Sequence, residues 1–218
     1  MSVRCVKDEY ITETSDIIDN EGNSYKTIGI GTQTWMAENL KTTKYNDGTA
    51  IPNVTDGNTW FSANTGAQCT YKNTTNADTI SNFGRLYNWH AVNTGKICPI
   101  GWHVPSKEEW STLNGYLTNA YGSSPGEPMA STMAWASSTV GIGRSLFSNN
   151  KSGFTALPGG LRGISGTFSG IGQQGYWWNS SESDEYKADN SWLSYDKSLL
   201  GTGSDIKQDG LSVRCLKN

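Results

Sequence analysis

Trp102-His103-Val104-Pro105-Ser106-Lys107-Glu108-Glu109-Trp110 is the stretch of sequence that says most about the fold. Ser106 and Glu109 have the spacing of a capping box, in which each side chain accepts a hydrogen bond from the other residue's backbone N–H. Leu113 and Leu117 follow the last tryptophan of the stretch at i+3 and i+7, so the three apolar residues share one helical face. The pattern predicts a helix that begins after Ser106 and packs this face inward.

A second helix is predicted just before this stretch. Phe83, Leu86, Tyr87 and His90 recur at helical spacing, and Asn93-Thr94-Gly95 provides a stop signal. With the first helix, this makes two helices for the whole chain.

The rest of the chain predicts short strands and long loops. Residues 41–79 and 118–150 are rich in small polar residues or Gly and Pro, which predicts loops in the first range and an irregular insertion in the second. Seven glycines between residues 154 and 178 predict a compact loop platform, because glycine readily adopts positive φ. Strands are expected at Ser24–Ile30, Gln33–Trp35, around Trp60-Phe61 and Cys69–Tyr71, and at Gly175–Trp178, Ser191–Ser194 and Leu211–Leu216. In the last of these, apolar residues alternate with polar ones, which predicts a half-buried strand.

Composition narrows both the fold class and the function class. Charged residues make up 17% of the chain and the net charge is −3, which lacks the basic patch expected of a nucleic-acid-binding protein. No apolar run approaches the roughly 20 residues that span a bilayer, so we expect no direct membrane insertion. Nine Trp and ten Tyr accompany abundant Gly, Ser, Thr and Asn, a mixture that favours an all-β or loop-rich α+β domain.

The two ends of the sequence repeat one another. Ser2–Asp8 reads SVRCVKD and Ser212–Asn218 reads SVRCLKN, with five of seven positions identical at an offset of 210 residues. We expect residues 1–9 to be the tail of a preceding tandem repeat, residues 10–19 to be a linker and residues 20–218 to be one domain. The alternative is that the first residues form an edge strand of this same domain.

The four cysteines do not have the spacing of a zinc site or a redox motif. Disulfides are therefore the expected use, and they indicate an exported protein. If Cys5 belongs to a preceding unit, at most one bridge forms within the domain. We expect that bridge to be Cys98–Cys215, and leave the pairing of Cys5 and Cys69 open.

Several motifs in one order carry a resemblance to a known family. They are Gly31–Leu40 (GTQTWMAENL), Lys96–Ser106 (KICPIGWHVPS), Gly153–Gly160 (GFTALPGG), Gly175–Trp178 (GYWW) and the closing Ser212–Cys215 (SVRC). Together they resemble the Fibrobacter succinogenes major paralogous (FISUMP) domain of bacterial surface proteins and lipoproteins. The match covers nearly all of residues 20–218, with departures in the 118–150 insertion and at Asn179.

A more distant similarity concerns the fold. Trp102–Trp110 is similar to the strand–Pro–cap–helix segment of formylglycine-generating-type proteins and other C-type-lectin-like folds. The resemblance implies a C-type-lectin-like α+β domain with two helices, short antiparallel strands, N- and C-terminal strands paired together, and long Gly-rich loops that bind ligands. In that superfamily, the loops before the last strand carry the variable positions of diversity-generating retroelement proteins, which correspond here to residues 179–197; this link is an analogy.

Catalytic signals are weak. The two histidines, His90 and His103, read as packed residues, and neither a nucleophile elbow nor a dinucleotide motif occurs. The closely spaced cysteine pair on which the superfamily's oxidising enzymes rely is missing from the sequence. We therefore expect no enzyme, the least favoured alternative being a carbohydrate-active enzyme that uses Glu182 and Asp184 as paired carboxylates.

Metal binding is a low-ranked expectation. Oxygen-bearing side chains between residues 179 and 189 could ligate Ca²⁺, but their spacing fits no EF-hand and acidic loop residues are usually solvated. We expect no cofactor, with calcium as the alternative. The candidate ligands are Asn179, Glu182, Asp184, Glu185 and Asp189.

The preferred interpretation is a non-enzymatic ligand-binding or adhesion module of a secreted or surface bacterial protein, one unit of a tandem array. Adjacent strand residues point to opposite faces, so we expect one of Trp177 and Trp178 to face the surface, and we include Trp178 among the ligand-binding residues. The ligand would be a protein or a polysaccharide; the alternative is a structural spacer without a ligand. The proposed ligand-binding residues are Tyr176, Trp178, Asn179, Ser181, Glu182, Asp184, Tyr186, Trp192 and Asp196.

Overall fold

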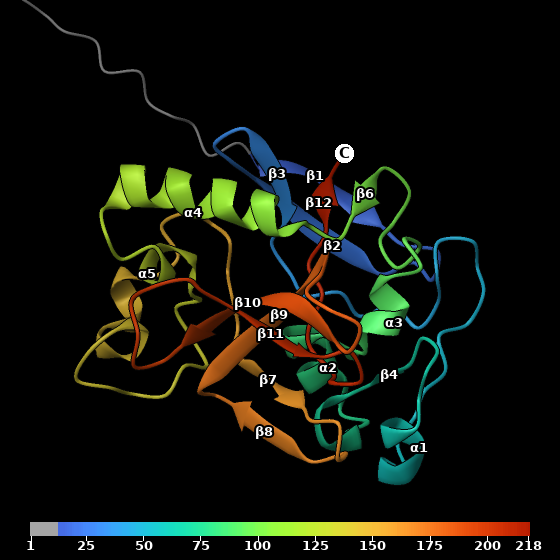
Figure 1. Cartoon of the computed structure of the whole chain (residues 1–218). Helices are drawn as coiled ribbons and strands as arrows, with labels where there is room; N and C mark the ends of the chain where they lie inside the picture. Colours follow the sequence, from blue (N-terminus) through green and yellow to red (C-terminus); the bar gives the residue numbers. More distant parts are fainter. Residues whose placement is uncertain (1–12) are drawn as a thin grey trace, which may run out of the picture.

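The computed structural model of the chain describes residues 13–218, and the first of its two large sheets includes the first and last described strands (Figure 1). The strand order in this sheet is β1-β2-β3-β12-β6, and the paired neighbours run antiparallel. The C-terminal strand β12 thus pairs with β3 and β6, not with the first strand. The bounds are β1 Glu13–Ile18, β2 Ser24–Ile30, β3 Gln33–Met36, β6 Trp102–His103 and β12 Leu216–Lys217.

Strand β1 corrects the interpretation of residues 10–19 as a linker. Residues 13–18 pair with β2, while the proposed repeat tail at residues 1–9 lies outside the described residues. Ile17 packs against the core opposite Tyr25, whereas Asp16 is exposed. A charged edge strand reads like a solvated linker because only one of its faces meets the core.

The segment before β12 ties the two large sheets together. All residues from Leu211 to Leu216 are buried, so the prediction of a half-buried alternating strand is wrong. The Trp178 N–H donates to the Ser212 carbonyl on one side (3.1 Å), and the Leu40 N–H donates to the Val213 carbonyl on the other (2.8 Å). Because the segment runs between two sheets, it is covered on every side.

Arg214 is the charged residue in this buried segment. Its guanidinium lies 4.2 Å from the Phe154 ring centroid and donates hydrogen bonds to the Phe154 carbonyl and to Asn39 Oδ1. Complete burial lowers the pKa of Arg214 to about 9. The arginine therefore connects the closing segment to two distant stretches of chain.

A disulfide joins Cys98 to Cys215, the pair expected from the sequence, with 6.0 Å between the two Cα atoms. It connects the closing segment to the loop that precedes β6. Cys69 is a buried free thiol.

Helix α4 (Lys107–Tyr121) has the predicted capping box, with both reciprocal hydrogen bonds present. Trp110, Leu113 and Leu117 are buried, as predicted. They pack in a cluster with Trp35 of the first sheet and Trp177 of the second. The long helix therefore covers parts of both sheets (Figure 1).

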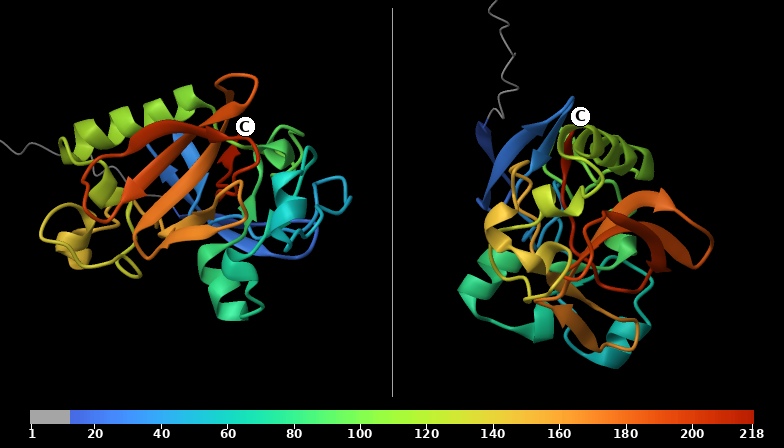
Figure 2. Two further views of the ribbon diagram at one scale, coloured as in Figure 1. Left: turned by 60° about the horizontal axis from the view of Figure 1, so that its bottom comes forward. Right: turned by 90° about the vertical axis from the view of Figure 1, so that its left-hand side faces the viewer.

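The second sheet has the strand order β11-β10-β9-β7-β8 (Figure 2). Both of its faces are covered where β9 crosses the centre, with Trp177 in the α4 cluster and Trp178 in a separate core cluster on the opposite side. The predicted loop platform is therefore wrong over β7 and β8, which form a regular antiparallel pair. The bounds are β7 Gly159–Arg162, β8 Phe168–Ile171, β9 Gln174–Glu182, β10 Lys187–Ser194 and β11 Gly201–Ile206.

The second predicted helix is broken into three elements. Gly84 ends α2 with a φ of 74°, and β5 then pairs with β4 before α3 begins. A β-carbon at Gly84 would lie 2.7 Å from the Leu40 carbonyl, so tight packing selects glycine there. The bounds are α2 Ala77–Phe83, β4 Gln68–Cys69, β5 Leu86–Tyr87 and α3 Trp89–Val92.

The described chain is an α+β domain with mostly short helices. It contains five α-helices where the sequence predicted two, and the stretch around Trp60-Phe61 is helical where a strand was expected. The 118–150 insertion is largely irregular, as predicted. The remaining elements are α1 Gly57–Phe61, α5 Gly126–Met129 and the 3-10 turns Tyr71–Asn73, Ile142–Arg144 and Leu146–Ser148.

Candidate functional site

The structure distributes the nine proposed ligand-binding residues over several environments. Two are in the core, several hold the turn between β9 and β10, and one lies beyond the far end of β10. Two others, Tyr176 of β9 and Trp192 of β10, lie directly opposite one another on the second sheet. Only this last pair forms the beginning of a surface site.

Trp178 and Asn179 are completely buried, so their assignment to a ligand surface is wrong. The Trp178 indole N–H donates to the Tyr87 carbonyl at 2.7 Å, and Asn179 Oδ1 accepts from Ser191 Oγ at 3.3 Å. Alternation along a strand predicted one inward and one outward tryptophan. Both are inside because the sheet is covered on its two sides.

The acidic residues near the β9–β10 turn hold that turn in place. Asp184 Oδ1 accepts the backbone N–H groups of Tyr186 (2.7 Å) and Lys187 (2.8 Å), and the Tyr186 bond is the main cause that lowers the pKa of Asp184. Glu182 forms an ion pair with Lys207, whose ammonium also donates to the Glu185 carbonyl at 2.7 Å. These carboxylates have local partners instead of a shared ligand-facing cavity.

Three of the five proposed calcium ligands have separate partners. Asp189, in particular, pairs with Lys107 at 3.1 Å, while Glu182 binds Lys207 and Asp184 closes its own turn. Among residues 13–218, no group of three or more His, Cys, Asp or Glu side chains is arranged to hold a metal ion.

Three further proposed residues lie around these elements. Tyr186 is exposed at the turn, with 69% of its surface accessible. Ser181 Oγ accepts the Lys107 backbone N–H at 3.0 Å, which adds a contact at the start of α4. Asp196 accepts from Ser194 Oγ at 2.6 Å, and this bond lowers the Asp196 pKa.

Tyr176 and Trp192 are partly exposed aromatic residues. The Trp192 ring lies against the backbone of Gly201 on β11, since a methyl group there would come within 2.1 Å of ring atom Cε2. Glycine at this position therefore lets the indole lie flat on the neighbouring strand. Among the described residues, Trp192 belongs to none of the three hydrophobic core clusters.

Two polar residues that the sequence analysis missed complete this group. Asn190 precedes Trp192 on the same side of β10, and its Nδ2 donates to Asp205 Oδ2 of β11 at 2.8 Å. Only 2% of the Asn190 surface is exposed, and its Oδ1 has no hydrogen-bond partner among the described residues. We refer to Tyr176, Asn190, Trp192, Gly203 and Asp205 as the Trp192 cluster.

A signal for the missed residues exists in the sequence. Gly201, Gly203 and Asp205 alternate along what proves to be β11, with small residues between them. Two glycines in a strand are unfavourable for a strand prediction, but they allow a neighbouring aromatic ring to lie on the strand.

Burial dominates the electrostatics of the Trp192 cluster. Burial raises the pKa of Asp205, and the positive charge of Lys187 partly offsets this rise. Burial also raises the pKa of Tyr176, and the negative charge of Asp205 raises it further. The neighbouring Asp209 has a pKa raised to about 6, first by burial and then by Asp205. Its carboxylate accepts the Ile164 N–H at 2.6 Å. The site is thus acidic and only partly solvated.

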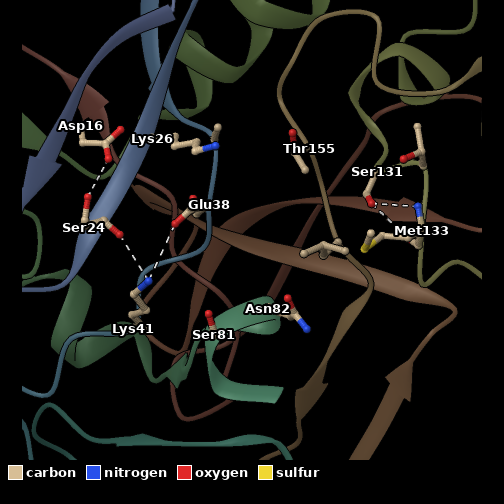
Figure 3. A pocket seen from close by; sticks show the side chains of 13 residues that line it. Asp16, Ser24, Lys26, Glu38, Lys41, Ser81, Asn82, Ser131, Met133 and Thr155 are labelled. Carbon is tan, nitrogen blue, oxygen red and sulfur yellow. Dashed lines mark hydrogen bonds and ion pairs between the residues drawn. The ribbon is translucent and has the colours of Figure 1, made fainter. Parts of the chain in front are cut away.

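A separate cavity of about 440 Å³ lies between β2, the end of α2 and the 131–133 loop (Figure 3). Lys41 spans part of it, bonding the Ser24 carbonyl at 3.3 Å and lying 3.8 Å from Glu38. Asp16 accepts from Ser24 Oγ at 2.9 Å. Two acidic and two basic residues line the cavity, so the lining does not favour one ligand charge.

Two further spaces flank other elements. One of about 510 Å³ lies between α4 and β11 and is lined by Trp110 and Thr202, among others. Another of about 150 Å³ adjoins Cys98 and His103. Neither contains any of the nine proposed ligand-binding residues.

The histidines occupy different surroundings. His103 bonds Glu109 at 2.9 Å through Nε2 and Asn218 at 2.7 Å through Nδ1, and it is only partly buried. His90 is half-buried, and burial followed by the charge of Lys207 lowers its pKa. The expected packed role therefore describes His90 better than His103.

The structural features define a class: an α+β domain closed by a disulfide-bonded buried segment, with a partly exposed aromatic and acidic cluster on its second sheet. The family model for the Fibrobacter succinogenes major domain matches residues 28–217. The chain belongs to this family. No curated protein and no solved structure matches it. Among the described residues, no helix is long and apolar enough to cross a membrane.

Proposed function

We propose that the chain is a non-enzymatic ligand-binding module of a secreted or surface protein, built on a C-type-lectin-like fold. The observation that carries this proposal is the placement of Trp192. A large aromatic residue is held flat against Gly201, partly exposed and outside the described core clusters. Exposed, rigid aromatic side chains supply contact area at a low cost in conformational entropy.

The surroundings of Trp192 support binding over simple packing. Tyr176 lies opposite on β9, and Asn190 and Asp205 add polar atoms on the same side of the sheet. A binding site usually combines apolar contact area with a few positioned polar groups. The ligand-binding residues in this proposal are therefore Tyr176, Asn190, Trp192 and Asp205, in place of the wider set from the sequence.

The Cys98–Cys215 disulfide supports an exported location, because such bonds persist in oxidising compartments. Membership of an array, as the terminal repeat suggests, would add avidity through linked copies. A structural spacer and a carbohydrate-active enzyme remain the alternatives. The enzyme alternative loses support from Glu182 and Asp184, whose carboxylates are held by Lys207 and by the β9–β10 turn.

The test is a screen of the purified domain against protein and polysaccharide arrays, followed by Trp192→Ala. The matched control is Phe147→Ala, since Phe147 is fully exposed in the 118–150 insertion and also presents an aromatic ring. Trp178→Ala is unsuitable because this residue is in the core. We expect binding to fall in Trp192→Ala and to persist in Phe147→Ala.

Three results would contradict the proposal. Absence of any ligand would favour the spacer, and loss of binding in Phe147→Ala alone would move the site to the insertion. Turnover of a polysaccharide during the screen would favour the enzyme.

A further inference from the structure

We infer that the Trp192 cluster binds a cationic group, of the lysine ammonium type, displayed by a protein partner. The inference rests on the proposed function and adds the chemistry of the ligand. It is carried by three features of the cluster: its acceptor atoms, its acidic groups, which form no ion pair, and its aromatic rings.

The acceptor atoms of the cluster exceed its donors. Asn190 Nδ2 donates to Asp205, while Asn190 Oδ1 accepts no hydrogen bond within the described residues. Only 2% of the Asn190 surface is exposed. An unpartnered buried polar atom costs free energy, so a ligand that supplies a donor there is favoured. An ammonium group offers three donors and no acceptor.

The location of this atom is defined by Gly203. A methyl group at Gly203 would lie 3.4 Å from Asn190 Oδ1 and 3.8 Å from Trp192 Nε1. The amide oxygen and the indole thus flank the same small space on the β11 backbone. Asp205 lies two residues farther along this strand and is already bonded to Asn190.

The acidic groups near this space, Asp205 and Asp209, form no ion pair within the described residues. Two basic residues of this region are engaged elsewhere, since Arg162 donates to the Val54 and Thr55 carbonyls and Lys207 binds Glu182, whereas Lys187 acts on Asp205 without forming an ion pair. Partial burial raises the pKa of both aspartates, and the charge of Lys187 offsets only part of this rise at Asp205.

The aromatic rings favour a cation over a neutral donor. Trp192 and Tyr176 occupy opposite register positions on β10 and β9, and both are partly exposed. A cation over an indole or phenol ring is attracted by the ring quadrupole, most strongly for Trp. An ammonium ion therefore suits the rings, the free amide oxygen and the carboxylates together. A hydroxyl group would use only the hydrogen-bonding atoms.

The experiment is an NMR titration of the intact chain with an end-blocked lysine hexapeptide. The matched probe is the same peptide with every ε-amine acetylated, which removes the charge and keeps the length. The Trp192 indole N–H signal, assigned by its loss in Trp192→Phe, reports binding at the site. We expect saturable shifts of this signal with the lysine peptide and none with the acetylated peptide.

Variants distinguish the site from general attraction to an acidic protein. Asp205→Asn and Gly203→Ala should each weaken binding about tenfold, by removing the charge and by filling the space. Gly203 has no positive φ and its methyl would make ordinary contacts, so this variant should fold. Asp184→Asn changes the net charge equally but lies at the β9–β10 turn, and should bind like the wild type.

The inference is overturned if the lysine peptide gives no saturable shift, if the acetylated peptide binds equally well, or if Asp184→Asn weakens binding as much as Asp205→Asn. The proposed function has a separate outcome. An uncharged ligand from the array screen that is sensitive to Gly203→Ala would keep the binding module and exclude the cation. If every ligand found binds equally well to the wild type, Gly203→Ala and Trp192→Ala, both the proposed binding site and the cation inference are wrong.

Discussion

Trp178 and Trp192 project from the same side of the second sheet, yet one is completely buried and the other is partly exposed. Trp178 lies under the Tyr87 backbone and within a core cluster that includes Val213 of the closing segment. Trp192 lies on the bare backbone of Gly201, near the edge of the sheet. What covers a strand, more than which residue it carries, separates a framework tryptophan from a candidate binding residue.

The largest effect should come from removing the buried tryptophan. Trp178→Ala should lower the free energy of unfolding by about 3–5 kcal/mol, because it leaves a cavity and removes the indole hydrogen bond to the Tyr87 carbonyl. Trp192→Ala should cost about 1 kcal/mol or less. Urea denaturation of both variants measures the difference. Equal losses would show that Trp192 is a packing residue and would end the comparison.

The disulfide should have the next largest effect, since it fastens the closing segment that buries Trp178. Cys98→Ser should lower the free energy of unfolding by about 2–4 kcal/mol. A reductant should lower the urea midpoint of the wild type towards that of the variant, and should leave the variant unchanged. A wild-type midpoint that does not respond to reduction would show that packing alone holds the segment.

The smallest effect concerns Asp209, which lies near the Trp192 cluster, and it depends on pH. The Asp209 pKa is raised from 3.8 to about 6, so the folded state binds this proton more tightly than the unfolded state does. The contribution of Asp209 to stability should therefore be most favourable at low pH and decline as pH rises through this window, by about 1 kcal/mol because partial exposure screens the charge.

Urea denaturation between pH 4 and pH 7 tests this expectation through the difference between wild type and Asp209→Asn. The difference should change across the window and level off near pH 7. Asp184→Asn is the control, because the pKa of Asp184 is lowered and its contribution should not decline with rising pH. A constant difference between the wild type and Asp209→Asn would show that solvent already compensates the Asp209 charge.

Local sequence signals predicted those elements whose cause is local. The capping box and the spacing of Trp110, Leu113 and Leu117 identified α4 with its correct starting residue. A helix forms its backbone hydrogen bonds between nearby residues, and the apolar spacing in the sequence marks its buried face. The apolar periodicity from Phe83 to His90 gave a wrong helix prediction because the cause that breaks the helix is a contact with a distant part of the chain. Close contact of Gly84 with the Leu40 carbonyl ends α2 there, and no local pattern reports that contact.

The candidate site was predicted in part. Tyr176 and Trp192 were among the proposed residues. Asp205 was missed because β11 was not recognised and its glycines resemble a loop, and Asn190 was missed because the predicted strand began one residue after it. Trp178 and Asn179 were placed wrongly, since strand alternation assumes one open face.

By itself, the sequence determined the family, the α+β class, the long capped helix and the expected pairing of two cysteines, because motifs and periodicities are properties of neighbouring residues. Only the tertiary structure decided that the closing segment runs between two sheets, that one tryptophan of the second sheet is covered while another is not, and which acidic residue lies beside the exposed one. Burial arises from contacts between distant stretches of chain, and those contacts form only when the two sheets and α4 pack together.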